Sequence, residues 1–274
     1  MTSPQRPGTD AHGPSTPTVI AHRGFAGLAP ENTPAAARLA AARGADVIEC
    51  DVVATADGDP VVFHDPALDA SGESRGITDR TGRVAERTTD YVTGATVLGS
   101  GEHVPTFARF VEAVPASVSL NVELKRPRDV EPRHGVPPDE IRVAHREAWQ
   151  PLVDRVLDVL DTNARGTWFS SFSQSALEAV RRRETSARIA PLAESVETAL
   201  EMAEMLGTDT IHPPITSLTT VEASRRLDAY TVNAWTARTW TDARDALRHD
   251  VDGLIADYPD LDAITDGSGT HTDT

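Results

Sequence analysis

The sequence predicts a (β/α)₈ barrel, and three observations support that prediction. Short segments rich in β-branched residues alternate with longer segments of helical period, the alternation occurs eight times, and no segment is repeated along the chain. The length agrees, because α/β barrels often reach the 274 residues of this chain as one domain, although a domain averages about 150. An open, doubly wound parallel sheet is the competing architecture on this pattern.

The expected strands are short apolar runs bounded by polar or turn residues. They cover residues 18–21, 46–53, 118–124, 167–172, 187–192, 209–212, 229–235 and 251–256. Helical stretches follow most of them, at residues 34–43, 139 to about 162, 174–183, 196–206, 218–227 and 241–248. The first helix has clear end signals, since Thr33 can cap it, Pro34 fits its first turn and Gly44 follows its last turn.

The alternation is interrupted once, over residues 65–104, where Gly, Thr and Asp are frequent and no period is visible. Irregular stretches of this length are commonly functional insertions, so we expect an inserted subdomain after the second strand, on the catalytic face. Residues 1–17 and 266–274 are rich in small and polar residues and are expected to form flexible tails. The barrel domain is therefore predicted to span residues 18–265.

The charge balance is strongly acidic, with 42 Asp and Glu against 26 Lys and Arg and a formal net charge of -16. This argues against nucleic-acid binding, which needs a basic surface. Only one of the basic residues, Lys125, is a lysine. An acidic, nearly lysine-free surface suits high ionic strength, as in a halophile, and the codon bias of a GC-rich genome is an equal alternative.

Cysteine and hydropathy patterns predict a cytoplasmic location. Cys50 has no second cysteine to pair with, so the chain has no internal disulfide. The first residues hold no apolar run of the kind found in signal peptides or anchors, so no stable membrane anchoring is expected.

Two strands carry acidic side chains on the face that should line the barrel. Alternate residues of a strand share a face, so Glu49 and Asp51 point one way, and Glu123 and Lys125 point together from the next strand. At the carboxyl ends of neighbouring barrel strands, the three carboxylates would converge where barrel enzymes keep their active sites. Oxygen ligands of this kind suit Mg²⁺ or Ca²⁺, and pairing of the acids with arginines is the alternative.

Two histidines each follow a short β run. His22 precedes Arg23 at the end of the first strand, and His64 follows three apolar residues near the paired acids. Each could be a hydrogen-bonded core histidine. Together they are typical of a general acid and base flanking a bound anion.

These segments resemble one known family, the glycerophosphodiester phosphodiesterases. The resemblance rests on motifs in the right order, namely His-Arg-Gly at 22–24, Pro-Glu-Asn-Thr at 30–33, Glu-Cys-Asp-Val at 49–52, Thr-Ala-Asp-Gly at 55–58, His-Asp at 64–65 and Glu-Leu-Lys at 123–125. Later matches at 170–172, 234–236 and 251–259 extend it over nearly the whole chain outside the tails.

The resemblance implies a TIM barrel with an inserted subdomain that hydrolyses glycerophosphodiesters to glycerol phosphate and an alcohol. It implies that His22 and His64 are the acid/base pair and that one divalent ion, Mg²⁺ or Ca²⁺, binds the three carboxylates. Positions Arg23 and Lys125 correspond to phosphate contacts. Trp235 corresponds to an aromatic residue near the glycerol.

Departures from the family pattern concern substrate preference rather than catalysis. Ala237 and Arg238 follow the late Trp-Thr pair where the family usually has Val-Asn, and Ala256 stands where Thr is common. The partner is expected to be a small-molecule glycerophosphodiester, acted on by a monomer or homodimer. A lysophospholipase D-like phosphodiesterase and a non-catalytic barrel that binds phosphate or a lipid headgroup are the alternatives.

Overall fold

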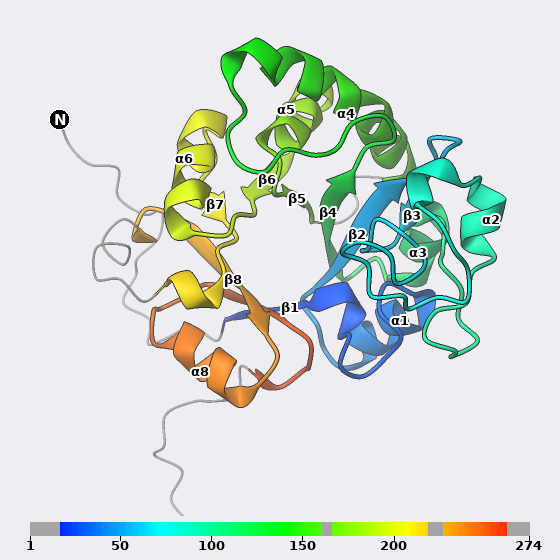
Figure 1. Ribbon diagram of the computed structural model, residues 1–274. Coiled ribbons are helices and arrows are strands. Elements are labelled where there is room, and N and C mark those ends of the chain that lie inside the picture. Colours follow the sequence, from blue (N-terminus) through cyan, green and yellow to red (C-terminus); the bar gives the residue numbers. More distant parts are fainter. Residues whose placement is uncertain (1–16, 161–165, 219–226, 262–274) are drawn as a thin grey trace, which may run out of the picture.

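The predicted barrel is present in the computed structural model, which describes residues 17–160, 166–218 and 227–261 (Figure 1). Its strands are β1 (Thr18–Ala21), β2 (Val47–Ala54), β4 (Ser119–Arg126), β5 (Thr167–Ser171), β6 (Arg188–Pro191), β7 (Thr210–Ile211), β8 (Thr231–Ala237) and β9 (Gly253–Ala256). They pair in parallel in the order β6-β5-β4-β2-β1-β9-β8-β7. A parallel bridge between Leu192 and His212 joins the two end strands, so the sheet is a nearly closed barrel and not an open sheet.

The helices surround the barrel and follow the predicted positions closely. They are α1 (Pro34–Ala42), α2 (Thr89–Thr93), α3 (Phe107–Ala113), α4 (Asp139–Val159), α5 (Gln174–Arg183), α6 (Val196–Leu206) and α8 (Trp240–Leu247). The sequence prediction lacked α2 and α3, both short and each capped by a threonine side chain. Most of the helix predicted at 218–227, and both predicted tails apart from residue 17, lie outside the described residues.

The two faces of the barrel strands have different chemistry. On β2, Ile48, Cys50 and Val52 face outward and belong to the main core beneath the helices. Ile20, Val47 and Ile255 form a separate small apolar cluster against Trp168 and Trp235. Farther along the same face of β2, the buried residues are Glu49 and Asp51. Polar residues therefore follow the apolar cluster toward the carboxyl ends of the strands.

The segment after β2 has its own packing. Strand β3 (Pro60–Val62) pairs antiparallel with β2 and stays outside the ring. Beyond it, Leu68, Val84, Val92 and Val97 pack together in a small apolar cluster. The predicted division into a barrel, an inserted subdomain at 65–104 and tails remains a prediction. Among the described residues, no helix has both the length and the apolar composition needed to cross a bilayer.

A fully buried histidine in the barrel should make the fold sensitive to acid. His212 Nε2 accepts a hydrogen bond from Asn233 Nδ2 at 3.0 Å, which requires a neutral ring, and burial lowers the pKa of His212 to about 3. The unfolded chain takes up this proton near pH 6.5 and the folded chain does not, so His212 costs stability as the pH falls below 6.5. At pH 5 the loss is about 2 kcal/mol.

Replacing this histidine should weaken that dependence. We expect the unfolding free energy of His212→Gln to fall less between pH 7 and pH 5 than that of the parent, as measured by urea denaturation. His103→Gln is the matched control, because His103 is exposed and should keep the parental pH dependence. A parental slope in His212→Gln would show that this ring titrates freely.

Candidate active site

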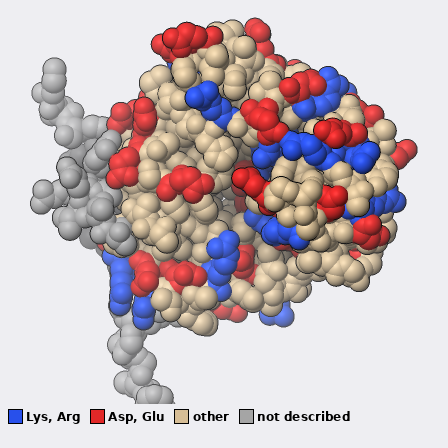
Figure 2. Space-filling view, in the orientation of Figure 1, with Lys and Arg blue, Asp and Glu red and all other residues tan. Residues whose placement is uncertain are grey.

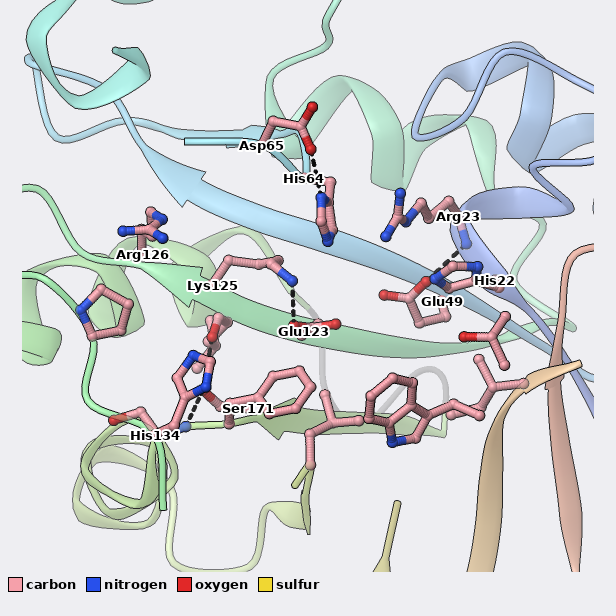
Figure 3. Close-up of a pocket in the computed structure, with 18 of the residues that line it drawn as sticks. His22, Arg23, Glu49, His64, Asp65, Glu123, Lys125, Arg126, His134 and Ser171 are labelled. Atoms are coloured by element: carbon pink, nitrogen blue, oxygen red, sulfur yellow. Dashed lines mark hydrogen bonds and ion pairs between the residues drawn. The ribbon is translucent and has the colours of Figure 1, made fainter. Parts of the chain in front are cut away.

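A cavity of about 500 Å³ opens at the carboxyl ends of the barrel strands. Figure 2 shows the hollow in the centre of this face, with acidic and basic side chains at its rim. Seven of the eight predicted site residues line it: Trp235 and six that are labelled in Figure 3, namely His22, Arg23, Glu49, His64, Glu123 and Lys125. The eighth, Asp51, is fully buried and contacts Arg23 and Lys125.

The chain reverses sharply after β1, and this turn places two of the site residues. Arg23 has φ 52°, in the left-handed region, and its backbone N–H donates to Glu49 Oε2 at 2.8 Å. Gly24 follows at φ 78°, where a Cβ would lie 2.7 Å from the Cβ of Ala36. The strained turn therefore requires glycine at this position and ties the end of β1 to β2.

The three carboxylates converge as predicted. Glu49, Asp51 and Glu123 each offer an oxygen within 4.8 Å of the others. Glu49 Oε1 and Asp51 Oδ1 are buried and have no hydrogen bond to any described residue. The second oxygen of Glu49 is held by the Arg23 N–H, and that of Asp51 is held by Asn32 Nδ2 at 2.8 Å. Buried carboxylate oxygens without donors are costly unless a cation binds them, so this oxygen set fits a divalent ion.

Nearby cations compensate only part of this negative charge. Lys125 Nζ lies 2.8 Å from Glu123 Oε1 and 3.6 Å from Asp51 Oδ1, and Arg23 Nε lies 3.2 Å from Asp51 Oδ2. Burial would raise the pKa of Asp51, but Arg23, His64 and Lys125 lower it. Burial and the charges of Asp51 and Glu123 raise the pKa of Glu49 well above its usual range. Basic side chains thus form ion pairs with Asp51 and Glu123, whereas Glu49 forms none among the described residues and is only partly compensated by Arg23.

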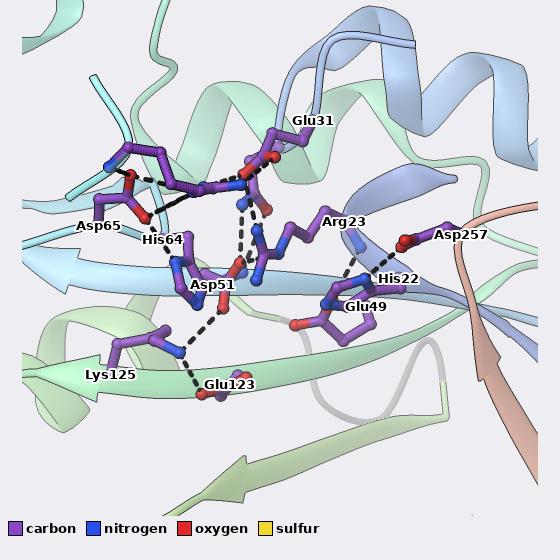
Figure 4. A network of polar contacts seen from close by, with 12 residues as sticks. His22, Arg23, Glu31, Glu49, Asp51, His64, Asp65, Glu123, Lys125 and Asp257 are labelled. Carbon is purple, nitrogen blue, oxygen red and sulfur yellow. Dashed lines mark hydrogen bonds and ion pairs between the residues drawn. The ribbon is translucent and has the colours of Figure 1, made fainter. Parts of the chain in front are cut away.

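Both histidines are anchored by carboxylates and face the cavity (Figure 4). His22 Nδ1 lies 2.5 Å from Asp257 Oδ1, and His64 Nδ1 lies 2.7 Å from Asp65 Oδ1. Burial lowers the pKa of His22, and the hydrogen bond to Asp257 opposes this shift. A carboxylate on Nδ1 fixes each ring and leaves Nε2 outside that bond, which is the arrangement that an acid/base residue needs.

Residues outside the predicted set hold this site together. Arg75 donates to Glu31 from both terminal nitrogens at 2.7 Å, and its Nε donates to Asp65 Oδ1 at 3.1 Å. Glu31 also accepts from Arg23 Nη1 at 3.0 Å. This network ties residues 65–104 to the turn after β1. Burial would raise the pKa of Asp65, but its bonds to His64 and Arg75 lower it to about 2.

Aromatic side chains form the wall beside Lys125. The Phe172 ring lies 5.8 Å from Lys125 Nζ, stacks on His134 and meets Trp235 edge-on at 5.5 Å. Trp235 Nε1 donates to the carbonyl oxygen of His212 at 2.8 Å, which fixes the indole. Arg238, one of the family departures, also lines the cavity, and its Nε lies 3.3 Å from Asp257 Oδ2.

Comparisons with known proteins point to one family. Residues 22–261 match the model of the glycerophosphoryl diester phosphodiesterase family. A glycerophosphodiester phosphodiesterase of Bacillus altitudinis is 26% identical over 88% of this chain and 95% of its own. A putative glycerophosphodiester phosphodiesterase of Bacillus subtilis is 36% identical over 39% of this chain. That alignment spans 44% of the B. subtilis protein, less than half of its length.

Solved structures show the same fold. An Oleispira antarctica phosphodiesterase in complex with the product sn-glycerol-3-phosphate superposes with a TM-score of 0.73 at 26% identity, over 89% of this chain and 94% of that one. A putative glycerophosphoryl diester phosphodiesterase of Silicibacter pomeroyi gives 0.74 at 25% identity, over 91% and 93% of the two chains.

Proposed function

The chain belongs to the glycerophosphoryl diester phosphodiesterase family, and from this membership we propose that it hydrolyses glycerophosphodiesters to glycerol phosphate and an alcohol. One observation carries the proposal. Two carboxylate-anchored histidines border a single cavity together with Glu49 and Glu123, and these two carboxylates form with the buried Asp51 a cluster that could bind a metal. A barrel that only binds phosphate would need the cations but not the acid/base pair.

Glu49, Asp51 and Glu123 would hold one divalent ion, Mg²⁺ or Ca²⁺. When bound, the ion supplies positive charge to a phosphate oxygen and helps to align the reacting groups. Arg23 and Lys125 would offset charge on the phosphoryl oxygens, which is the main contribution that side chains can make to phosphoryl transfer. Trp235, fixed through its indole N–H, would cover the glycerol carbons.

His22 and His64 would divide the proton transfers between them. One ring accepts the proton of the attacking hydroxyl, and the other donates a proton to the leaving alkoxide. The lowered pKa of His22 keeps that ring neutral at neutral pH, as a proton acceptor must be.

The attacking group would be either the glycerol 2-hydroxyl, which gives a cyclic phosphate that water opens, or water itself. A 2-deoxy substrate separates the two routes. Complete loss of its cleavage supports attack by the 2-hydroxyl, whereas near-normal turnover supports attack by water. Both rates can be followed by release of the alcohol.

Even the most conservative replacement of the one lysine in the chain should lower activity. Lys125 Nζ contacts Glu123, Asp51 and the Phe172 ring. A compact ammonium fits at this position, whereas the broader guanidinium of arginine would crowd the phosphate. We expect Lys125→Arg to lower kcat/KM by about 10- to 100-fold and Lys125→Met to lower it further. Thermal unfolding checks that both variants fold. Parental activity in Lys125→Arg would show that this position needs only a positive charge.

The proposed activity is tested by a product assay on the purified protein. Glycerophosphocholine, glycerophosphoethanolamine, glycerophosphoinositol and lysolipids are offered with Mg²⁺, Ca²⁺ or chelator. Release of glycerol phosphate from the water-soluble diesters, lost in chelator, supports the proposal. Cleavage of lysolipids alone would point to a lysophospholipase D-like enzyme, and binding without turnover would point to a non-catalytic barrel.

Two broader proposals complete this assignment. A cytoplasmic location is supported by the free, buried Cys50 thiol. A role in glycerol and lipid metabolism follows from the proposed reaction. Repeating the assay over a range of salt concentrations tests whether the acidic composition reflects a high-salt habitat.

A further inference from the structure

Asn121 is a buried amide that the reaction proposed above does not use. It lies on β4, only 1% of its surface is exposed, and it lines the cavity. Its side-chain oxygen is buried and accepts no hydrogen bond within the described part of the chain. An amide oxygen at this depth loses its hydrogen bonds to water without gaining one in the protein, so its retention calls for a partner outside the protein.

The pairing of β2 with β4 places this amide beside the carboxylates. Glu49 is in register with Asn121, and Asp51 is in register with Glu123. Because residues two apart on a strand share a face, the four side chains form a two-by-two patch on one face of the sheet. Three members of the patch are the carboxylates, and Asn121 is the fourth.

Each carboxylate of the patch has one oxygen held by a protein donor. Arg23 N–H holds Glu49, Asn32 holds Asp51, and Lys125 holds Glu123. Within the segments that the structure describes, the other oxygens of Glu49 and Asp51 accept no hydrogen bond, and the same holds for the oxygen of Asn121. Ser170, in register with Glu123, also has a buried, unpaired oxygen, but it lies on β5, outside this two-by-two patch.

We propose that the amide oxygen of Asn121 is a fourth protein ligand of the divalent ion and that it biases the site toward Ca²⁺. The proposal rests on the proposed function only in assuming that the carboxylates bind a metal. Ca²⁺ takes six to eight oxygen ligands in flexible geometry and readily accepts amide carbonyls. Mg²⁺ requires a compact octahedron and keeps several waters, so it gains less from a fourth protein oxygen.

Calorimetric titration of Ca²⁺ and Mg²⁺ into the substrate-free protein tests this assignment. We expect Asn121→Leu, which keeps the shape and removes the oxygen, to weaken Ca²⁺ binding by about 10-fold or more and Mg²⁺ binding by less. Asn233→Leu is the matched control. Asn233 is an equally buried asparagine on β8, but its amide is paired with His212. The control should leave both affinities unchanged.

A second variant distinguishes an oxygen ligand from a hydrogen-bond donor and covers a possible folding failure of Asn121→Leu. Asn121→Asp keeps an oxygen toward the ion, so it should retain Ca²⁺ binding. If the amide nitrogen of Asn121 instead donates to a neighbouring carboxylate, Asn121→Asp replaces that donor with a second negative charge. The two carboxylates then repel each other, and Ca²⁺ binding weakens. Tb³⁺ luminescence lifetimes in H₂O and D₂O should report an additional bound water in Asn121→Leu.

The outcomes separate this proposal from the proposed function. Parental Ca²⁺ affinity in folded Asn121→Leu, or loss of Ca²⁺ binding in folded Asn121→Asp, overturns the role of Asn121 and leaves the activity standing. Absence of divalent-ion binding in the parent protein overturns the metal site itself.

Discussion

Replacing either His22 or His64 with alanine is expected to lower kcat by about 10²- to 10⁴-fold. Each ring is oriented by a carboxylate on Nδ1 and faces the same cavity. When either ring is removed, water must carry out that proton transfer. Water is not held in position, and its pKa does not match that of the group with which it exchanges the proton. Because the proposal has both rings acting in one reaction, the double variant should be little worse than the poorer single variant.

The measurement is single-turnover release of alcohol at saturating substrate. His103→Ala is the matched control, since His103 is exposed and outside the cavity. Near-parental rates in both His22→Ala and His64→Ala, with parental thermal unfolding, would contradict the acid/base assignment.

Replacing Glu49 with glutamine should abolish metal-dependent activity while stabilising the metal-free protein. Burial and the two neighbouring carboxylates raise the pKa of Glu49 well above its ordinary value of 4.5. Because the unfolded chain loses this proton more readily than the folded chain, Glu49 lowers the stability of the metal-free protein as the pH rises above 4.5. A neutral amide of the same shape removes that cost at pH 7 and keeps the bond from Arg23 N–H. It also removes one of the three proposed charged ligands, so we expect metal binding to weaken by at least about 10²-fold.

Thermal unfolding with and without the ion measures both effects. At a metal concentration of 100 times Kd, the parent should gain about 2.7 kcal/mol, and Glu49→Gln should gain little. In chelator, Glu49→Gln should unfold at a higher temperature than the parent. Glu112→Gln, on the exposed surface of α3, should behave like the parent throughout. A parental response to metal in Glu49→Gln would exclude this carboxylate as a ligand.

The barrel could be predicted from the sequence because its signal is local. Each strand is a short apolar run, and the predicted bounds differ from the observed ones by at most two residues, as at β4 and β8. Polar residues alternate with apolar ones on β2 and β4, which identified Glu49, Asp51 and Glu123. The barrel geometry then brought these three together as expected.

The supports of the site could not be predicted in the same way, because they depend on contacts between distant segments. Asp257 reaches His22 because β9 pairs with β1 across 235 positions of sequence. Arg75 reaches Glu31 from a stretch without any period. The adjacency of His64 and Asp65 was visible, but adjacency alone does not show that their side chains meet. The role inferred for Asn121 likewise needed the strand register, which composition does not reveal.

The most direct test of the proposed function is the position at which the substrate is cut. Purified protein is incubated with glycerophosphocholine and a divalent ion, and the products are identified by ³¹P NMR. We expect glycerol 3-phosphate as the phosphorus-containing product, with free choline, and no turnover by His22→Ala. Phosphocholine as the product, or an unchanged diester with either ion, would contradict the proposed function.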